Sequence, residues 1–398
     1  MTVSLVIRPD EVQDSADLAA QIRHDIHSHP EVGLYLPETQ KRILDALKEM
    51  GCQDVTVNVG GEKVSSVVAV IKGSRSGRTI GVRADMDALP LNERTGVSYS
   101  SCYEKRMHAC GHDGHVATLL GLVHYLMGHR DFAGTVVAIF QPGEEGFAGA
   151  RYMIEDGLVE RFGIEEFYAL HAEIGFPVGS VGFVSGFATA NADIFEITFE
   201  GQGGHGARPH MAKDPVVAMG ETILALQTIV SRNVEPDKAC VVSIGCAQAG
   251  SPQGTSVIPQ KAYLCGTTRC WLPDVRDLIE KRIVEIAQGV ASVYGIKAHP
   301  VFTRLYPAMY NDPDRVAQAK ELAKLALGDD HVGDFKRTAG GEDFSFMLNA
   351  RPGCLFRLGM RDDTHNVGVH NEGFDFNDKA IATGIAAMLT VVLNRAAA

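Results

Sequence analysis

The chain has 398 residues, of which 45% are hydrophobic and 22% are charged, and its formal net charge is −12. This composition is typical of a folded globular protein, and the length favours two domains over one. The acidic balance argues against non-specific binding to nucleic acid or to an anionic membrane, because both require a basic surface. We therefore expect neither of them as a partner.

Signals for export and for cross-linking are weak. The apolar stretches are shorter than the roughly 18 residues that a membrane span requires. Residues 4–7 form a short apolar segment, and the charged residues Arg8, Asp10 and Glu11 follow it, which is too short and too acidic for a secretory signal. The eight cysteines are scattered along the chain, which disfavours a disulfide framework. These features favour a cytoplasmic protein.

Helix and strand signals alternate in the first part of the chain. Apolar residues with helical spacing, or in short continuous runs, define the expected elements. They predict helices over 16–27, 39–50 and 114–127, and strands over 55–59, 66–71, 79–84, 135–140 and 167–170. This succession implies an α/β fold in which helices cover both faces of a mostly parallel, mixed sheet.

A second pattern begins near residue 183. It predicts a strand over 194–199, a helix over 215–230, strands over 239–246 and 262–268, a helix over 274–294 and a strand over 296–302. This β-α-β-β-α-β order is the ferredoxin-like arrangement. After it, the chain resumes with a helix, a strand over 354–358 and a closing helix over 378–393. We thus expect a discontinuous catalytic domain, residues 1–182 and 303–398, and an inserted domain, residues 183–302.

Two adjacent carboxylates, Glu144 and Glu145, follow the strand over 135–140 and a Gln-Pro-Gly turn. Open α/β sheets bind ligands outside the carboxyl ends of their strands. Either glutamate alone could be a solvated charge near the start of a helix. Two carboxylates held together repel each other unless a cation lies between them or one is protonated. One of them can then bind a metal ion while the other transfers protons.

The segment 108–115 reads His-Ala-Cys-Gly-His-Asp-Gly-His and comes just before the third helix. Imidazole, thiol and carboxylate groups are the usual ligands of borderline metal ions. The alternative is a set of surface and capping groups, with Asp113 as the cap, but this explains one histidine better than it explains the cluster. Gly111 permits a sharp turn, so that Cys110 and His112 can face one ion.

Other candidates follow neighbouring strands. His171 comes directly after a strand and could be a core histidine, but its place at the strand terminus, level with Asp85 and Glu144, favours a metal ligand. Asp87 could orient a liganding imidazole or could cap the turn that follows the strand. His370 is a weaker candidate when it is considered alone.

The expected insert contains a glycine-rich segment, residues 201–210, with two histidines and one arginine. The segment could be only a turn that joins a strand to a helix. Alternatively, His205 could donate a hydrogen bond to a developing oxyanion. Arg269 could form a two-pronged contact with a substrate carboxylate.

These motifs together resemble the metallopeptidase family that contains aminoacylase, carboxypeptidase G and hippurate hydrolase. The resemblance covers nearly the whole chain and is closest to the branch of hippurate hydrolase and the auxin-conjugate (N-acyl-amino-acid) amidohydrolases. It rests on the sequence blocks at residues 27–31, 83–90, 108–115, 141–145, 203–210, 340–343 and 375–378.

The resemblance implies a binuclear centre with two divalent metal ions per subunit. A thiolate ligand favours Zn²⁺, whereas carboxylates also suit Mn²⁺, so both ions remain open. Glu144 would be the general base, and Asp85 and Asp87 would orient the imidazole ligands. The implied ligands are Cys110, which bridges the ions, His112, Glu145, His171 and His370.

The resemblance also implies roles for the insert. It would be a lid or dimerisation domain, and the protein a homodimer or a dimer-based homo-oligomer. His205 would reach the active site of the partner subunit, while Ser256 and Arg269 would lie near the substrate carboxylate. Residues 256–259 read Ser-Val-Ile-Pro, where relatives usually have Asn-Val-Ile-Pro. Serine lacks the paired donor and acceptor of an amide, so this substitution bears on recognition of the carboxylate.

The reaction that these features favour is hydrolysis of the amide bond in an N-acyl amino acid, a small molecule with a hippurate-like or other aromatic acyl group. The substitution at Ser256 keeps open a dipeptidase or an aromatic aminohydrolase that releases ammonia. A non-catalytic, metal-stabilised binding protein is a further alternative. The presence of both Glu144 and Glu145 argues against it, because binding alone needs no proton acceptor.

Overall fold

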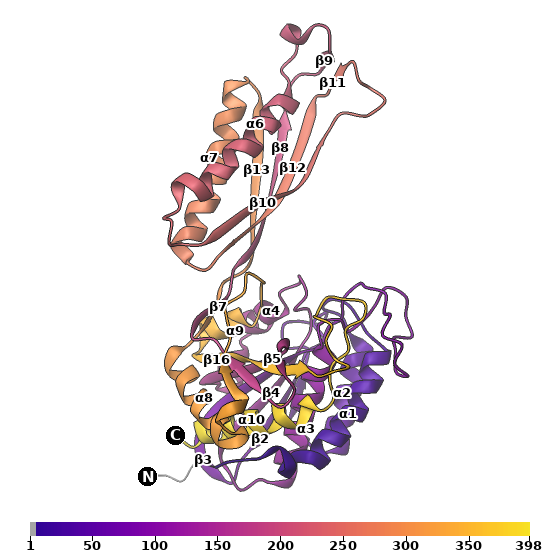
Figure 1. The fold of residues 1–398 in the computed structure, drawn as a ribbon, viewed down its shortest axis with the longest axis vertical. Helices are drawn as coiled ribbons and strands as arrows, with labels where there is room; N and C mark the ends of the chain where they lie inside the picture. Colours follow the sequence, from indigo (N-terminus) through magenta and orange to yellow (C-terminus); the bar gives the residue numbers. More distant parts are fainter. Residues whose placement is uncertain (1–4) are drawn as a thin grey trace. The chain divides into compact units, whose positions relative to one another are not determined.

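The computed structural model describes residues 5–398 (Figure 1). Of the apolar segment expected at residues 4–7, Ser4 lies outside this range. The chain divides into two compact units. The first comprises the described residues up to Ala188, then Tyr310–Arg337 and Asp343–Ala398. The second comprises Thr189–Met309 and Thr338–Glu342.

An eight-stranded sheet forms the first unit, with the order β1-β2-β4-β3-β5-β16-β6-β15. The strands are β1 (Val55–Val57), β2 (Val67–Lys72), β3 (Arg75–Asp85), β4 (Ala133–Gln141), β5 (Glu166–Pro177), β6 (Val181–Phe183), β15 (Val332–Asp334) and β16 (Gly353–Arg361). The four central strands, β4, β3, β5 and β16, run parallel to one another, whereas β1-β2, β2-β4 and β16-β6 are antiparallel pairs. The mixed, mostly parallel sheet expected from the sequence is confirmed.

Helices cover both faces of this sheet. They are α1 (Gln13–Ser28), α2 (Pro37–Glu49), α3 (His112–Gly128), α4 (Gly149–Glu155), α5 (Leu158–Phe162), α8 (Pro313–Leu327), α9 (Ser345–Ala350) and α10 (Ala380–Ala396). On one face, α3 and α10 pack against β3 and against each other, with α1 beside α3 and α8 beside α10. On the other face, Phe167 of β5 packs edge-on against Phe344, next to α9.

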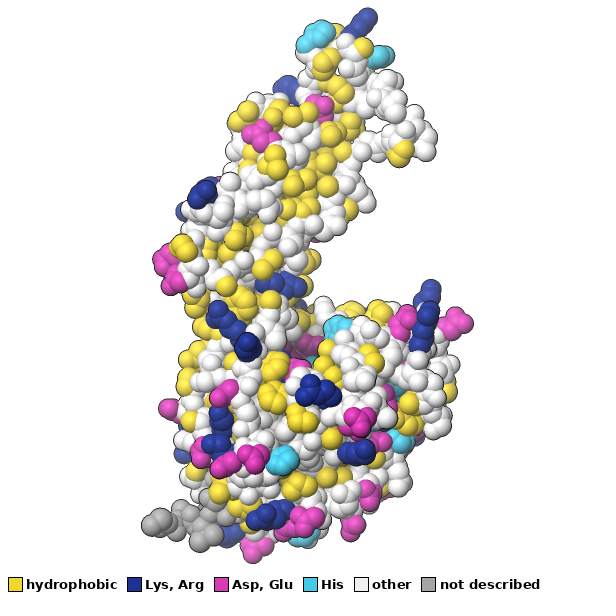
Figure 2. Space-filling model, in the orientation of Figure 1, with side chains coloured by type: hydrophobic (Ala, Val, Ile, Leu, Met, Phe, Trp, Pro, Cys, Tyr) yellow, Lys and Arg dark blue, Asp and Glu magenta, His cyan; other side chains and the backbone are white. Residues whose placement is uncertain are grey.

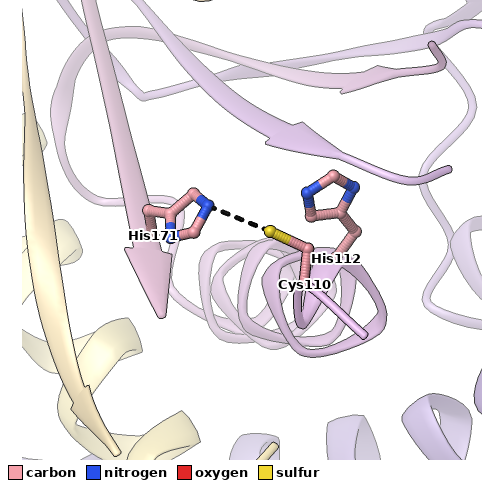
Figure 3. A group of neighbouring side chains, drawn as sticks. All are labelled: Cys110, His112 and His171. Atoms are coloured by element: carbon pink, nitrogen blue, oxygen red, sulfur yellow. Dashed lines mark hydrogen bonds between the residues drawn. The ribbon is translucent and has the colours of Figure 1, made fainter. Parts of the chain in front are cut away.

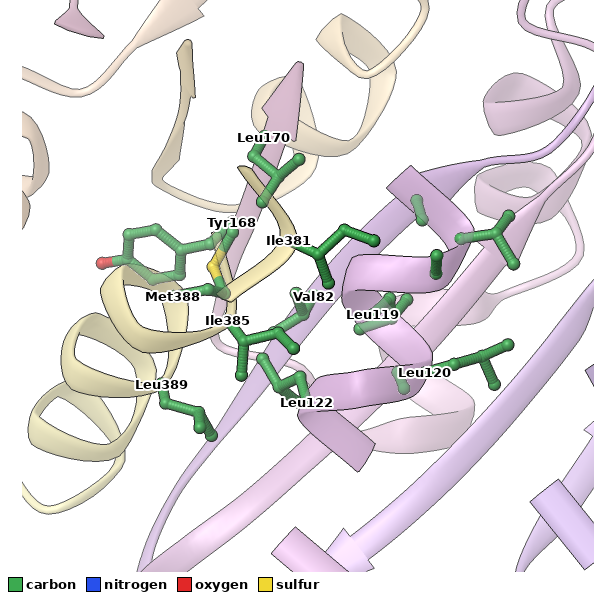
Figure 4. Close-up of a cluster of buried hydrophobic side chains, with 14 of the residues drawn as sticks. Val82, Leu119, Leu120, Leu122, Tyr168, Leu170, Ile381, Ile385, Met388 and Leu389 are labelled. Atoms are coloured by element: carbon green, nitrogen blue, oxygen red, sulfur yellow. The ribbon is translucent and has the colours of Figure 1, made fainter. Parts of the chain in front are cut away.

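The main hydrophobic core lies between α3, α10 and the sheet. Leu119 and Leu122 of α3 and Ile385 and Met388 of α10 meet Val82 of β3 (Figure 4). Most residues of α3 and nearly all of α10 are buried, which explains why both sequences are largely apolar. Among residues 5–398, no helix combines the length and the apolar character needed to cross a membrane.

The second unit contains a four-stranded antiparallel sheet with the order β10-β12-β8-β13. Its elements are β8 (Ala192–Glu200), β9 (Gly204–His205), α6 (Pro215–Thr228), β10 (Cys240–Ala249), β11 (Val257–Ile258), β12 (Lys261–Cys270), α7 (Pro273–Val293) and β13 (Lys297–Tyr306). Helices α6 and α7 pack on the sheet, while β9 pairs only with β11. Burial alternates along β8, as expected for a sheet with helices on one face.

The boundaries between the units differ from those expected at 182/183 and 302/303. The change occurs instead at 188/189 and 309/310, and residues 338–342 belong to the second unit. Hydrogen bonding explains the shift. β6 remains in the large sheet, and β7 (Gly186–Thr189) pairs with β14 (Met309–Asn311), so the connecting segments are ordered strands.

Candidate metal centre

The carboxyl ends of β3, β4 and β5 meet at one edge of the sheet in the first unit. Asp85 is opposite Gln141, and Arg83 is opposite Ala169, so that His171 lies level with Asp85. The expectation that His171 ends its strand is wrong, because β5 continues beyond it. The strand continues since it still pairs with β16 after its pairing with β3 has ended.

Cys110, His112 and His171 come together at this edge (Figure 3). Their ligand atoms lie within 4.8 Å of one another, and the Sγ of Cys110 is 3.5 Å from the Nε2 of His171. His112 is the first residue of α3, and Gly111 before it has a φ of 84°. This left-handed conformation favours glycine and makes the turn that the sequence pattern predicts.

A second group joins the first one through shared residues. Ligand atoms of Cys110, Glu145 and His370 lie within 4.8 Å of one another, as do those of His112, Glu144 and Glu145. The Oε1 of Glu145 is 3.2 Å from the Nε2 of His370. The structure therefore brings together the five expected ligands and the expected base, although they come from four separate segments of the chain.

Asp87 holds the loop that carries the two glutamates. Its carboxylate accepts hydrogen bonds from the backbone N–H groups of Glu144, at 2.9 Å, and of Glu145, at 3.0 Å. It also lies 3.4 Å from the Nδ1 of His112. Asp87 is buried, so these contacts are shielded from water. Of the two roles open from the sequence, the geometry favours support of the site over capping of a turn.

Two supporting residues were not singled out from the sequence. The Nε2 of His115 accepts a hydrogen bond from the backbone N–H of Ala172, so its Nδ1 carries the proton and donates to Asp85 at 2.5 Å. Arg83 is fully buried and donates to Asp85, to Gln141 and to Asp343. An arginine in the middle of an apolar strand could have indicated this network, because a buried charge needs partners.

The residues present suit a divalent cation. Neither ring nitrogen of the buried His112 makes a hydrogen bond within residues 5–398. Burial raises the pKa of the Cys110 thiol to about 12. Burial opposes protonation of His112, but Asp85 and Cys110 outweigh it and raise the pKa of that imidazole well above its usual range. A bound cation would favour the thiolate and the neutral imidazole.

The other expected site residues belong to the second unit. His205 is exposed in β9, and its Nδ1 accepts a hydrogen bond from the backbone N–H of Ala207. Ser256 lies beside it, because its carbonyl accepts a hydrogen bond from the N–H of Gly206 at 2.7 Å. Arg269 is half-buried in β12 and donates to the carbonyl of Thr268 at 2.8 Å. Burial lowers the pKa of this arginine.

His205 and Ser256 lie far from Arg269 within this unit. His205 is opposite Val257, which precedes the start of β12 at Lys261 by four residues. Arg269 lies near the other end of β12. Eight residues of extended strand span about 27 Å. Thr268, next to Arg269, is opposite Asp193, close to the point where the chain enters the unit. One insert therefore cannot supply both His205 and Arg269 to the same small substrate.

Known proteins match the chain over almost its full length. The profile of peptidase family M20/M25/M40 matches residues 81–394. The chain belongs to this family. Its relatives include hippurate hydrolase of Campylobacter jejuni, which is 37% identical over 376 residues, or 94% of this chain and 95% of the relative. An N-acetyldiaminopimelate deacetylase of Anoxybacillus flavithermus is 35% identical over 364 residues, or 92% of this chain and 94% of the relative.

Solved structures agree with this assignment. A dinuclear metal-binding peptidase of the M20 family from Bacillus subtilis matches with a TM-score of 0.80 and 30% identity, over 96% of this chain and 99% of that one. Family membership and the donor cluster around Cys110 together make this M20-family protein a metal-dependent hydrolase of amide bonds.

Proposed function

We propose that the protein hydrolyses the amide bond of N-acyl amino acids, with hippurate-like or other aromatic acyl conjugates as the substrates to test first. The observation that carries the proposal is the buried Glu144 and the half-buried Glu145 against the imidazoles and the thiol, since metal ligands and a proton acceptor stand side by side. The similarity to a hippurate hydrolase and to an N-acetyldiaminopimelate deacetylase supports this substrate class.

The proposed cofactors are two divalent ions, either Zn²⁺ or Mn²⁺. When they are bound, such ions lower the pKa of a water molecule and polarise the substrate carbonyl. The donor set of one thiol, three imidazoles and a carboxylate suits Zn²⁺ best, whereas the adjacent carboxylates also suit Mn²⁺. The residues that would hold the ions are Cys110, His112, Glu145, His171 and His370.

The chain's own residues transfer the proton in this proposal. Glu144 accepts a proton from the attacking water at a carboxylate oxygen and later delivers it to the nitrogen of the leaving amine. Its burial keeps bulk water away from this transfer. Asp87 fixes the backbone of Glu144, so the carboxylate stays in place while it gains and loses the proton.

A substrate panel tests the proposed function. Purified protein supplied with Zn²⁺ or Mn²⁺ is given N-benzoyl and N-acetyl amino acids, dipeptides and aromatic amines, and the release of amine or ammonia is measured. We expect the N-acyl amino acids to give the highest kcat/KM, about 10⁴ M⁻¹s⁻¹ or more, as ordinary enzymes reach. A chelator should abolish the activity, and elemental analysis should report which metal the active protein contains.

Other outcomes of the panel would overturn the proposal in distinct ways. Faster cleavage of dipeptides would assign a dipeptidase, and release of ammonia from aromatic amines would assign an aminohydrolase. The serine at position 256, in place of the asparagine usual in the resembled family, is the observation that keeps both alternatives in the panel. No turnover on the whole panel with metal supplied would leave a binding protein.

We also propose that the protein forms a homodimer through the second unit, with the partner subunit's His205 acting on the substrate oxyanion. The distance within one insert between His205 and Arg269 supports this arrangement, because one of the two residues must then come from a second copy if both contact the same substrate. Figure 2 shows apolar side chains, in yellow, on the surface of this unit. Val217 and Leu224 of α6 are exposed, and β10 is an edge strand. Exposed apolar surface of this kind marks interaction sites.

Mixing two inactive variants tests this arrangement. Glu144→Gln and His205→Ala homodimers should each have low activity. After subunit exchange, half of the dimers are mixed, and each mixed dimer has one site with an intact glutamate and an intact histidine. Activity should therefore return to about a quarter of the wild-type value, since half of the sites in half of the dimers are complete. No recovery, despite exchange seen by mass spectrometry, would place His205 in the site of its own subunit.

A further inference from the structure

Arg357 is a charged residue in the interior of the large sheet. It lies in β16, which has β5 on one side and β6 on the other. Its direct neighbour across the parallel pair is His171, one of the proposed metal ligands, and its neighbour on the other side is Gly182. Neighbouring strands are about 4.8 Å apart, and directly opposed residues share a face of the sheet. Arg357 therefore stands beside the metal centre, on the face that carries His171.

No carboxylate in the described part of the chain pairs with this arginine. Within residues 5–398, the guanidinium of Arg357 makes neither a hydrogen bond nor an ion pair, and it lies 5.6 Å from the centroid of the Phe335 ring. The acidic residue nearest along this face is Glu173, which is opposite Gly359, and its Oε1 is already bonded to the backbone N–H of Gly175 at 2.8 Å. Five donor N–H groups are thus left for a ligand or for solvent.

An unpaired charge in this position is unfavourable for the fold alone. Arg357 is partly buried, and the residues before and after it, Phe356 and Leu358, are fully buried. Arg83, a buried arginine of the same sheet, donates instead to the carboxylates of Asp85 and Asp343 and to Gln141. A partly desolvated cation without an anion costs free energy, which a bound anion would recover.

The surroundings of Arg357 indicate which anion would fit. Phe335 stacks near Phe176, with ring centroids 5.7 Å apart, and a side chain added at Gly182 would collide with Phe176. These two rings form an apolar wall beside the guanidinium. A planar carboxylate on a short carbon chain matches both parts, because the fork of the arginine binds the carboxylate and the rings contact the methylene groups.

We propose that Arg357 binds a second carboxylate of the substrate, distinct from the α-carboxylate, and so makes the enzyme select dianionic N-acyl amino acids. This inference rests on the proposed function. The second carboxylate can belong to the amino-acid side chain or to the acyl group, and the two sources share the same chemistry at the arginine. Arg357 thus determines specificity, while the proton transfers remain with Glu144.

Matched substrates test this proposal. N-acetyl-glutamate is compared with its monoanionic counterpart N-acetyl-glutamine, and N-succinyl-alanine with N-succinamoyl-alanine, so that each pair differs in one charge. For wild-type protein, the dianion of at least one pair should have the higher kcat/KM, and that pair identifies the source of the carboxylate. Arg357→Gln should lower kcat/KM for that dianion about 10- to 100-fold, mainly through KM, and leave kcat/KM for the monoanionic partner within about twofold.

Two controls separate recognition from folding. Arg357→Lys keeps the charge and should retain part of the preference. Arg361→Gln removes a charge at the exposed end of the same strand and should change nothing. Equal losses on dianionic and monoanionic substrates, or no loss on either, would overturn the proposal.

A binding measurement distinguishes failure of this inference from failure of the proposed function. If wild-type protein cleaves none of these amides, the proposed function fails. Calorimetric titration of the Glu144→Gln protein with the same pairs, with and without Arg357→Gln, then decides this inference alone. Tighter binding of a dianion that Arg357→Gln removes supports it, and equal affinities contradict it.

Discussion

Glu144→Gln is expected to lower kcat by about 10²- to 10⁴-fold, the usual contribution of a general base. The amide of glutamine has nearly the shape of the carboxylate but cannot accept the proton of the attacking water. The backbone of residue 144 should stay in place, because its N–H still donates to Asp87. Steady-state kinetics with an N-acyl amino acid, together with elemental analysis of the same sample, measures both expectations.

The adjacent glutamate provides the matched control. Glu145→Gln should lower the metal content, because its carboxylate shares a cluster of donor atoms with Cys110 and His370. Glu144→Gln should instead retain metal while turnover is lost. Near-normal turnover of Glu144→Gln would exclude it as the base, and a loss of metal as large as that of Glu145→Gln would make it a ligand.

Arg23→Met is expected to lower the free energy of unfolding by about 3–5 kcal/mol, as the removal of one partner from a buried ion pair does. Arg23 is fully buried in α1, and its guanidinium contacts Asp113 at 2.9 Å, Asp375 at 3.2 Å and Asp378 at 2.6 Å. Asp113 is also fully buried, so the substitution would leave a carboxylate short of positive charge in a medium of low dielectric constant.

Urea unfolding followed by far-UV circular dichroism measures this effect. The only tryptophan, Trp271, belongs to the second unit, so its fluorescence would not report on Arg23. Lys41→Met is the control, because this exposed side chain pairs with Asp45 on the surface. Its removal should change the free energy of unfolding by about 0.5 kcal/mol or less. If Arg23→Met changes the free energy of unfolding no more than the control does, His27, which also contacts Asp113, is sufficient to stabilise that carboxylate.

The elements that carry the site could be predicted because their signals are local. The apolar run over 135–140 lies within β4, and the alternation over 194–199 lies within β8. The cluster around Cys110 was also visible, since its residues are close in the sequence and one turn at Gly111 brings them together. Such features depend on residues that are close in the sequence, so they can be predicted from a single sequence without an alignment.

The remaining features depend on contacts between distant segments. His370 reaches Glu145 only because its backbone has a φ of 61° and its N–H donates to the carbonyl of Ala109 at 2.7 Å. Periodicity does not signal a left-handed histidine or its partner. The role of Arg23 was likewise missed, because its carboxylate partners lie between about 90 and 355 positions away along the chain. Neither helical spacing nor composition indicates which distant acid neutralises a buried base.

The double hydrogen bond of Asp87 has a consequence for how this protein can diverge. A single carboxylate on β3 anchors two consecutive peptide groups in the loop after β4, so the chemical part of that loop does not depend on what comes next. Phe147, two positions after Glu145, has an exposed side chain. Substitutions after Glu145 can thus change the loop surface while Glu144 and Glu145 keep their positions. One hydrolytic site can then be retained by enzymes with different substrates.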